Sequence, residues 1–319
     1  MRDNNLSFLI RQRNLALNTT NRNHLLLRRG RTIIRARGLI LNSSSSSAKK
    51  TDKMENYNND LFKEEEEKRA GTNTNTNNKK VLLTFDVDGT LIRSTGQDAN
   101  RFHKNAFKFG FKKVFNIETS IDCVEHHGST DKLIIKAVLN YHKVDEERIL
   151  EGLENVCQAM VEYAEENAED AANGIELLPG VYELLERLSK REDCCCALVT
   201  GNLEPIAWAK MKQLGIDKFF QREVRGGFGS DHEQRSALVS IAHERAKSII
   251  DFHADRRYHF GDTHNDITAA EQSGAIAIGL ATGIWSLDDL KSVSVKKDEA
   301  LFLESLADVD DVLTKLRLI

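Results

Sequence analysis

The sequence predicts an α/β fold in which a parallel sheet is wrapped by helices. From Val81 onward, short apolar runs alternate with segments of helical periodicity, and polar residues directly follow several of the runs. The chain has 319 residues, 40% hydrophobic and 29% charged, which is typical of a globular protein with one or two domains. No window approaches eighteen uninterrupted apolar residues, so the sequence predicts no membrane span.

Each apolar run predicts a strand, and each following periodic segment predicts a helix. The expected strands are 81–86, 195–200, 257–261 and 275–280, with a weaker strand at 300–303. The expected helices are 179–191, 203–215, 233–248 and 264–273, with a closing helix from Ala307 to Leu316. Ligands of such sheets bind at the carboxyl ends of the strands, so we expect the functional residues just after each strand.

Two carboxylates directly follow the first expected strand, in the sequence Asp86-Val-Asp88-Gly89-Thr-Leu. Gly89 allows the chain to turn at once, so that both side chains can face one substrate. Neighbouring carboxylates repel each other unless a cation lies between them or one of them holds a proton. Bound Mg²⁺ would satisfy the first condition and an acid/base role the second. The pattern therefore predicts a phosphoryl-transfer site, and the alternative is a solvated Asp-Gly turn.

Polar residues also follow two later strands. Thr200-Gly-Asn202 precedes a helix, where a hydroxyl and free backbone N–H groups can bind phosphate. Asp262 follows the next strand, and Asp266 lies four residues later, about one helical turn away. One of these acids can bind a metal while the other orients it. Taken singly, the first pattern is also an ordinary helix cap and the second an ordinary acidic helix start.

A phosphate surrounded by four acids requires more positive charge than one Mg²⁺ supplies, so a fixed side-chain cation is expected. Arg235, near the start of an expected helix, is the best candidate, and Lys210 and Lys212 are the runners-up. The alternative for Arg235 is a solvated side chain in the first turn of that helix.

A long insertion separates the first motif from the second. Residues 87–199 number 113, far more than a crossover helix requires. Helical periodicity runs through 131–141 and 147–165, so we expect a separate helical lid over 97–178 that excludes water and shapes specificity. The adjacent His126 and His127 are expected at its surface. The core is then expected over 81–96 and 179–319.

The amino-terminal region differs in charge from the rest of the chain. Residues 1–50 contain eleven Lys or Arg and one acid, whereas the whole chain has a net charge of −4. This Arg-rich, Ser-bearing and acid-poor stretch predicts an organelle transit peptide over 1–42, for a mitochondrion or plastid; the protein is otherwise expected in the cytoplasm. A basic tail that binds nucleic acid or acidic membrane is the alternative. Residues 43–80 are polar and low in complexity, and they predict a disordered linker.

Three consecutive cysteines, Cys194, Cys195 and Cys196, open an expected strand. Neighbouring strand residues alternate between faces and lack the spacing of metal ligands. We therefore expect small core residues in a reducing compartment.

The order Asp-x-Asp-Gly-Thr, Thr-Gly-Asn, a basic residue and Gly-Asp-Thr-x-x-Asp resembles the motifs of the haloacid dehalogenase superfamily of hydrolases, over roughly residues 80–319. The resemblance implies a Rossmann-like parallel sheet core with an inserted α-helical cap. It implies that Asp86 is a nucleophile that forms an aspartyl-phosphate, and that Asp88 is the general acid and then the general base.

The same resemblance implies a ligand set. Mg²⁺ would be held by Asp86, the backbone carbonyl of Asp88 and Asp262, with Asp266 in support. Phosphate oxygens would be held by Thr200, Asn202 and Arg235, although the family more often has Lys at the last of these positions. Arg keeps the charge and adds bidentate reach.

Within the superfamily, Asp88 indicates a phosphatase or phosphomutase, because the dehalogenases lack this second Asp and the transport ATPases have Thr there. The turn Gly128-Ser-Thr-Asp131 and the later Thr282-Gly283 resemble phosphoglycolate phosphatase-like members. For the first turn, a helix cap and a substrate contact remain alternatives.

The expected function is Mg²⁺-dependent hydrolysis of a small phosphate monoester, with phosphoglycolate favoured. The alternatives are a β-phosphoglucomutase-type phosphomutase, a nucleotidase and a non-enzymatic binding protein. A phosphonate-hydrolysing relative would need a Schiff-base lysine, and nothing distinguishes Lys104, Lys108 or Lys132 for that role. No nucleic acid or membrane partner is expected for the mature domain, and the oligomeric state is open.

Overall fold

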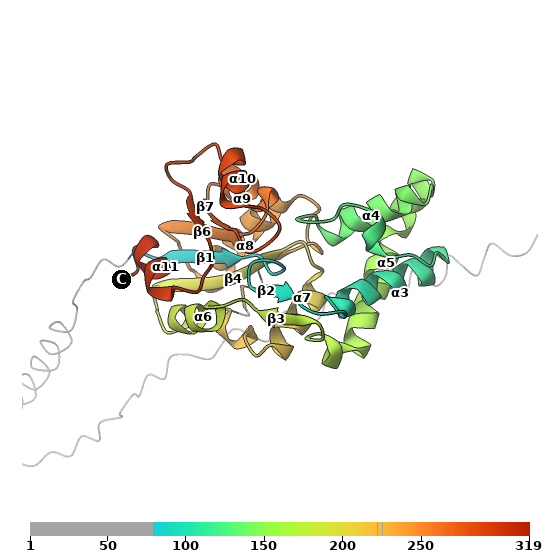
Figure 1. Cartoon of the computed structure of the whole chain (residues 1–319), viewed down its shortest axis with the longest axis horizontal. Coiled ribbons are helices and arrows are strands. Elements are labelled where there is room, and N and C mark those ends of the chain that lie inside the picture. Colours follow the sequence, from blue (N-terminus) through green and yellow to red (C-terminus); the bar gives the residue numbers. More distant parts are fainter. Residues whose placement is uncertain (1–78, 222, 225) are drawn as a thin grey trace, which may run out of the picture. The chain divides into compact units, whose positions relative to one another are not determined.

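The computed structural model describes residues 79–221, 223–224 and 226–319. A six-stranded parallel sheet lies at the centre of this part, in the order β5-β4-β1-β6-β7-β8 (Figure 1). The predicted α/β fold with a parallel sheet is therefore confirmed. The expected transit peptide and all but the last two residues of the expected linker lie outside the described residues. The strands are β1 (Val81–Phe85), β4 (Cys194–Thr200), β5 (Gly227–Phe228), β6 (Arg256–Gly261), β7 (Ile276–Leu280) and β8 (Leu301–Leu303).

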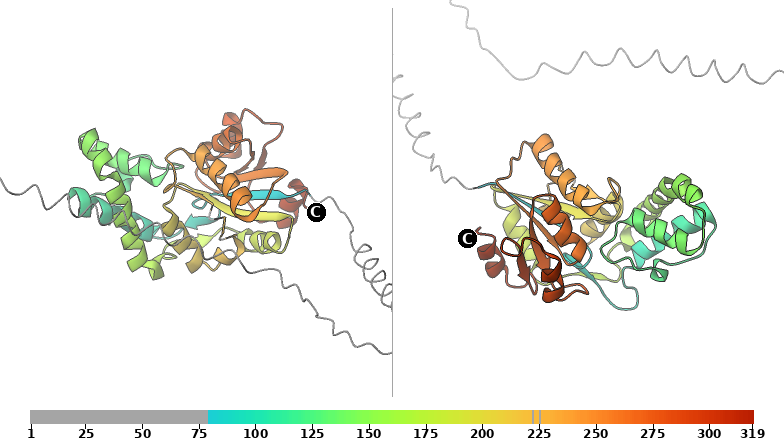
Figure 2. Two further views of the ribbon diagram at one scale, coloured as in Figure 1. Left: turned by 180° about the vertical axis from the view of Figure 1, so that it is seen from behind. Right: turned by 90° about the horizontal axis from the view of Figure 1, so that it is seen from above.

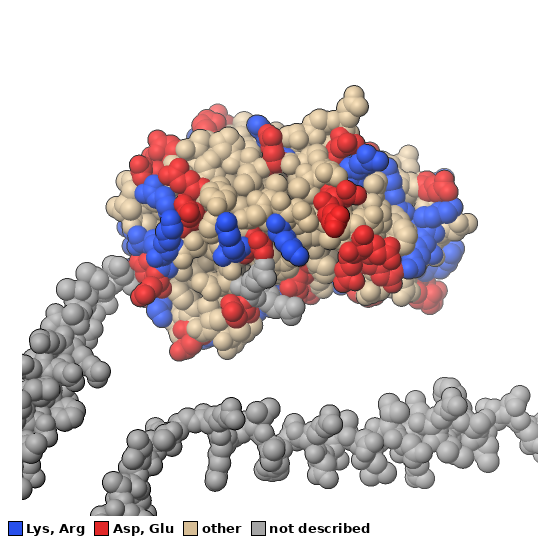
Figure 3. Space-filling view, turned by 90° about the horizontal axis from the view of Figure 1, so that it is seen from below, with Lys and Arg blue, Asp and Glu red and all other residues tan. Residues whose placement is uncertain are grey.

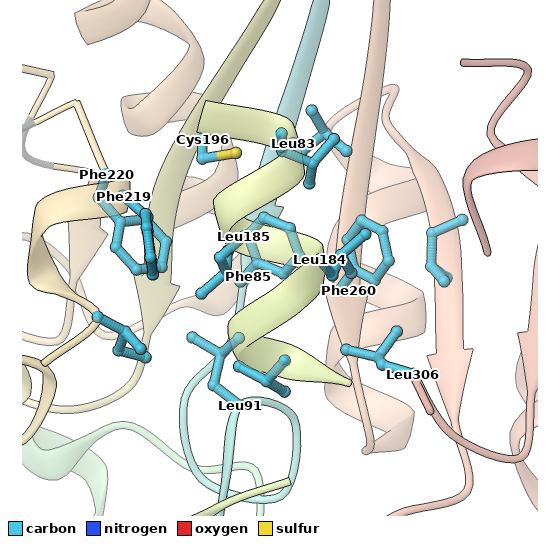
Figure 4. Close-up of a cluster of buried hydrophobic side chains, with 14 of the residues drawn as sticks. Leu83, Phe85, Leu91, Leu184, Leu185, Cys196, Phe219, Phe220, Phe260 and Leu306 are labelled. Carbon is cyan, nitrogen blue, oxygen red and sulfur yellow. The ribbon is translucent and has the colours of Figure 1, made fainter. Parts of the chain in front are cut away.

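Helices cover both faces of the sheet, because alternate strand residues point to opposite sides. Leu83, Phe85 and Phe260 face a core cluster under α6, and the rings of Phe85 and Phe260 stack 4.5 Å apart (Figure 4). Leu82 and Val199 face the other side, under α8 and α9. The core helices are α6 (Val181–Ser189), α7 (Glu204–Gln213), α8 (Arg235–Ile250), α9 (His264–Gln272), α10 (Leu287–Val293) and α11 (Val309–Lys315).

The three consecutive cysteines divide between the two faces of β4, as predicted. Cys194 and Cys196 belong to the cluster under α6, whereas Cys195 packs with Leu82 on the opposite side. All three are buried free thiols. They therefore serve as small core side chains.

A helical insertion, defined here as residues 95–174, leaves the core after β2 (Ile92–Ser94) and returns at β3 (Ile175–Leu177). These two short strands pair antiparallel and lie side by side where the insertion meets the core (Figures 1 and 2). Its helices are α3 (Arg101–Phe115), α4 (Asp131–Tyr141) and α5 (Glu146–Glu166). Short 3₁₀ helices lie in the insertion at Ile121–Cys123 and Ala168–Asp170, and in the core at Asp217–Phe219.

The insertion has an apolar core of its own. Phe102, Phe107 and Phe111 of α3 pack against α4 and α5, and Leu203 and Ile206 at the start of α7 join the same cluster. The expected helices at 131–141 and 147–165 correspond to α4 and α5. The insertion is thus packed against the core through the segment that follows β4.

Charges of both signs lie side by side on the surface. Figure 3 shows Lys and Arg next to Asp and Glu, including at the end of the molecule formed by the insertion. Pairs such as Lys112 with Glu118 are exposed and contribute little stability. Among the described residues, no helix is both long enough and apolar enough to cross a membrane.

Candidate active site

The site lies at the carboxyl end of β1, the strand between β4 and β6. Asp86 directly follows β1, so Thr200 at the end of β4 and Asp262 after β6 flank it on either side. These side chains, with Asp88 and Asn202, line one cavity of about 380 Å³ between the core and the insertion. The residues that the sequence placed after separate strands therefore meet at one edge of the sheet, as parallel strands require.

Three acidic side chains crowd together here, and two of them, Asp86 and Asp262, line the cavity. Oxygens of Asp86, Asp262 and Asp266 all lie within 4.8 Å of one another. Burial raises the pKa of Asp262 to about 8, and the nearby Asp266 and Asp86 add to this effect. Burial likewise raises the pKa of Asp86 to about 7, although Arg235 opposes it. A divalent cation among the three would favour their charged forms, so this donor set fits Mg²⁺.

Asp266 also has a structural role at the start of α9. Its carboxylate accepts hydrogen bonds from the backbone and the hydroxyl of Thr263, at 3.1 and 2.6 Å, which closes a capping box. Burial alone would raise the pKa of Asp266, but Arg235 and His259 outweigh it and hold the pKa well below its usual value. Asp266 is therefore a fixed anion at the base of the cluster.

Two glycines allow the neighbouring loops to approach Asp262. A Cβ at Gly89 would lie 2.2 Å from Asp262 Oδ2, and a Cβ at Gly283 would lie 1.8 Å from the same atom. Gly89 also has a positive φ of 93°. Thr282 Oγ1 donates to the Gly89 carbonyl at 2.5 Å and ties the two loops together. The backbone thus closes around the acidic cluster.

Arg235, in the first turn of α8, is the cation beside Asp86. Its Nη2 donates to Asp86 Oδ1, and its Nε lies 2.6 Å from Asp266 Oδ1. Its Nη1 donates to the carbonyl of Gly128 in the insertion, at 3.2 Å. Only 8% of Arg235 is exposed. Of the runners-up, Lys212 is exposed on α7, whereas Lys210 lies against Asp88.

Asp88 lies in a separate hydrogen-bond network. Its carboxylate accepts from Asn202 Nδ2 at 3.0 Å, from Asn100 Nδ2 at 3.3 Å and from Lys210 Nζ at 2.9 Å. Burial alone would raise the pKa of Asp88, but Lys210 and His103 outweigh it and hold the pKa below its usual value. The two carboxylates of the first motif therefore have different environments.

Lys210 and Asn100 were missed as partners of Asp88 by the sequence reasoning. Lys210 lies two helical turns beyond Asn202, and no motif marks it. Asn100 precedes α3 with a left-handed φ of 50° and provides no side-chain cap. An asparagine before a helical segment was the available signal, but it predicts a cap rather than a contact with Asp88.

The turn Gly128–Asp131 of the insertion packs directly onto the core. The Asp131 backbone N–H donates to the Gly201 carbonyl at 2.8 Å, and a Cβ at Gly201 would lie 2.4 Å from the Ser129 carbonyl oxygen. Thr130 is the N-cap residue of α4, but its hydroxyl donates to the Glu233 carbonyl and makes no cap hydrogen bond. The turn thus joins the insertion to the loop between Thr200 and Asn202.

Residues 83–271 match the family model of the haloacid dehalogenase-like hydrolases. The chain belongs to this family. Among solved structures, it is similar to a hydrolase from Pseudomonas syringae, with 21% identity, a TM-score of 0.51, and coverage of 75% of this chain and 99% of the other. It is also similar to a candidate beta-phosphoglucomutase from Bacteroides vulgatus, with 19% identity and a TM-score of 0.51. That match covers 75% of this chain and 89% of the other. At these identities the likeness shows the fold. No curated protein matches the chain in sequence.

The cavity of this haloacid dehalogenase-like hydrolase is also lined by basic side chains, of which Arg93 is paired with Glu176. Arg93, Lys104, His126 and His127 all line it. The two histidine rings stack 4.9 Å apart, and His127 is exposed, but the pair borders the cavity as well as the surface. Lys104 Nζ lies 3.0 Å from Asp122 Oδ1. Burial lowers the pKa of His127, which favours its neutral form.

Proposed function

We propose that this hydrolase is a Mg²⁺-dependent phosphatase that acts on a small phosphate monoester through an aspartyl-phosphate on Asp86. The observation that supports this proposal is the clustering of Asp86, Asp262 and Asp266 beside the Arg235 guanidinium. Asp86 and Asp262 would hold the ion, with Asp266 behind them. When bound, Mg²⁺ neutralises charge on the phosphate oxygens and the nucleophile.

The reaction has two half-reactions, in which these side chains have different roles. Asp86 attacks phosphorus, its Oδ–P bond forms, and the P–O bond to the alcohol breaks. Thr200, Asn202 and Arg235 bind the phosphate oxygens and stabilise the charge of the transition state. In the second half-reaction, water attacks the phosphorus, and Asp86 leaves as a carboxylate.

Asp88 would transfer the protons of both half-reactions. It donates a proton to the departing alcohol oxygen, and it later accepts a proton from the attacking water. The ion pair with Lys210 favours the carboxylate form that activates water. An incoming phosphate dianion raises the proton affinity of a neighbouring carboxylate, which favours the acid form needed in the first step.

The cavity favours a small ester with a second anionic group. Its volume is about 380 Å³, and Arg93 and Lys104 are among the residues that line it. Phosphoglycolate is small and carries a phosphate and a carboxylate on one methylene carbon, so it fits both properties. It is therefore the favoured substrate.

The test is a screen of small phosphate esters with Mg²⁺, run on the wild type, on Asp86→Asn and on Asp288→Asn as the matched control. Asp86→Asn is expected to lose turnover by at least about 10³-fold while it keeps its circular dichroism spectrum and melting temperature. The Asp288 side chain is 95% exposed on α10, so its substitution is expected to leave turnover unchanged.

Equal turnover of Asp86→Asn and wild type would refute the nucleophile assignment. Removal of divalent ions with EDTA is expected to abolish turnover, and Mg²⁺ should restore it. Transfer of the phosphoryl group to a second sugar phosphate, without release of inorganic phosphate, would instead indicate a phosphomutase.

A further inference from the structure

Lys210 is a fully buried cation with a defined set of partners. Its side chain is 0% exposed, and it is among the largest fully buried side chains of the described residues. Nζ lies 2.9 Å from both carboxylate oxygens of Asp88 and 2.9 Å from Asn202 Oδ1. A fourth contact, at 3.4 Å, joins it to His103 Nδ1. Burial of an ammonium group costs free energy unless it is hydrogen-bonded. The partners of Nζ therefore indicate what this lysine does.

The insertion encloses this lysine from the other side. His103 of α3 has Nδ1 toward Lys210, and its Nε2 lies 3.1 Å from Asp131 Oδ2. The same Asp131 oxygen accepts a hydrogen bond from the backbone N–H of Leu203, just before α7, at 2.8 Å. His103 and Asp131 are 5% and 1% exposed. A continuous chain therefore runs from Asp88 through Lys210 and His103 to Asp131, from the core into the insertion.

The position of Lys210 differs from that of a substrate ligand. Asp88 lines the cavity and its side chain is 34% exposed, whereas Lys210 lies behind it and does not line the cavity. Because Nζ contacts both oxygens while Asn202 Nδ2 donates to Oδ2, the rotation of the Asp88 carboxylate is restricted. A buried ion pair is often no more stabilising than apolar side chains of similar volume, so stability alone is a weak explanation for this lysine.

We propose that Lys210 is a positioning residue that holds the Asp88 carboxylate in its proton-transfer orientation, and that His103 and Asp131 of the insertion hold Lys210 in place. This inference rests on the proposed function, in which Asp88 transfers the protons. It follows that the proton-transfer apparatus is complete only while the insertion lies on the core.

The experiment compares two esters on four proteins: the wild type, Lys210→Met, Asp88→Asn and, as a control on the same helix, Lys212→Met. One ester is p-nitrophenyl phosphate, whose leaving group departs without a proton. The other is the alkyl phosphate that the wild type hydrolyses fastest, whose alkoxide needs a general acid. Melting temperatures are measured for each protein.

The quantity compared is kcat/KM, which covers only the steps up to departure of the leaving group, so the base role of Asp88 in the second half-reaction does not enter it. Lys210→Met is expected to lower kcat/KM for the alkyl ester about 10²-fold and for p-nitrophenyl phosphate less than about 10-fold. Asp88→Asn should show the same selectivity for the leaving group, with a larger loss. Lys212→Met should match the wild type, because this side chain is exposed. If Lys210→Met does not fold, His103→Ala serves in its place and should show a smaller loss of the same selectivity.

Two outcomes overturn the inference in distinguishable ways. If Asp88→Asn selectively loses the alkyl ester but the folded Lys210 or His103 variant loses both esters equally, or neither, Lys210 does not position Asp88. If Asp88→Asn itself shows no selectivity between the esters, the proton-transfer role in the proposed function fails, and the inference fails with it.

Discussion

At the residue scale, the acidic cluster depends on the absence of a side chain at Gly283. An added Cβ would lie 1.8 Å from Asp262 Oδ2, so either the carboxylate or the loop must move. Gly283→Ala is expected to weaken the apparent Mg²⁺ affinity about 10- to 100-fold, measured as the Mg²⁺ concentration that gives half-maximal turnover. Asp288→Asn is the control, because this side chain is 95% exposed on α10. An unchanged Mg²⁺ dependence in Gly283→Ala would argue against Asp262 as a ligand.

Arg235 provides a second test at this scale. Three of its nitrogens reach Asp86, Asp266 and the Gly128 carbonyl, a geometry that a single ammonium group does not reproduce. Arg235→Met is expected to lower kcat/KM about 10²- to 10³-fold, and Arg235→Lys by about 10-fold, because charge is kept while the fork is lost. Equal losses in both variants would show that geometry, rather than charge, carries the function of this side chain.

The sequence predicted some of these residues better than others, for a physical reason. Asp86, Thr200 and Asp262 each follow an apolar run directly, so locating the strands also located the side chains. Lys210 and His103 lie inside helices, and their relation to Asp88 depends on how α7 and α3 pack, which no local spacing specifies. The sequence therefore left the choice of phosphate-site cation open, and the structure places Arg235 beside Asp86 and Lys210 beside Asp88.

At the scale of elements, β1 and β4 were predictable because each is a buried run of mostly apolar residues; for β1 all five residues are buried. Strand β5 has only two residues, too few to leave a pattern. Helix α3 was not singled out, and its start has no side-chain cap, with Asn100 in a left-handed conformation. A capping residue in the sequence predicts the start of a helix only where its side chain caps that helix.

Strand β4 leads to a prediction about thiol reactivity. Burial raises the pKa of Cys194 to about 11 and that of Cys195 to about 12, and it raises the pKa of Cys196 well above its usual value. Cys157 in α5 is buried with a pKa raised to about 12, whereas Cys123 is partly exposed. Because the thiolate is the reactive form, the native protein at pH 8.5 should react rapidly with iodoacetamide at one cysteine at most.

Mass spectrometry of the native and the urea-unfolded protein checks this prediction. All five cysteines should react after unfolding, and the native modification should lie at Cys123. Rapid modification of Cys195 in the native state would mean that β4 is accessible from the side of α8.

At the scale of the whole molecule, the core and the insertion each have an apolar cluster, and the site lies where they meet. The turn Gly128–Asp131 contacts the loop after β4, the segment that precedes α8 and the start of α9. The insertion therefore contributes to the site through its contacts with the core. The length of the insertion was readable from the sequence, but its contacts with Gly201 and Arg235 were not, because they join segments far apart in the chain.

The amino-terminal region gives the last prediction. The family match covers residues 83–271, every candidate site residue lies between Asp86 and Gly283, and the start of β1 is tied to the core by Lys80, whose backbone N–H donates to Asp255 Oδ2 at 2.8 Å. A chain that starts at Lys79 is therefore expected to match the full-length protein in melting temperature and kcat/KM. A truncated chain that folds but loses activity would show that the basic region contributes to catalysis, since the site residues are all retained.

We further propose that residues 1–42 direct the protein to an organelle and are removed there. Amino-terminal sequencing of the protein from its own cells should then find a start between residues 40 and 80, and an intact Met1 would refute the transit peptide.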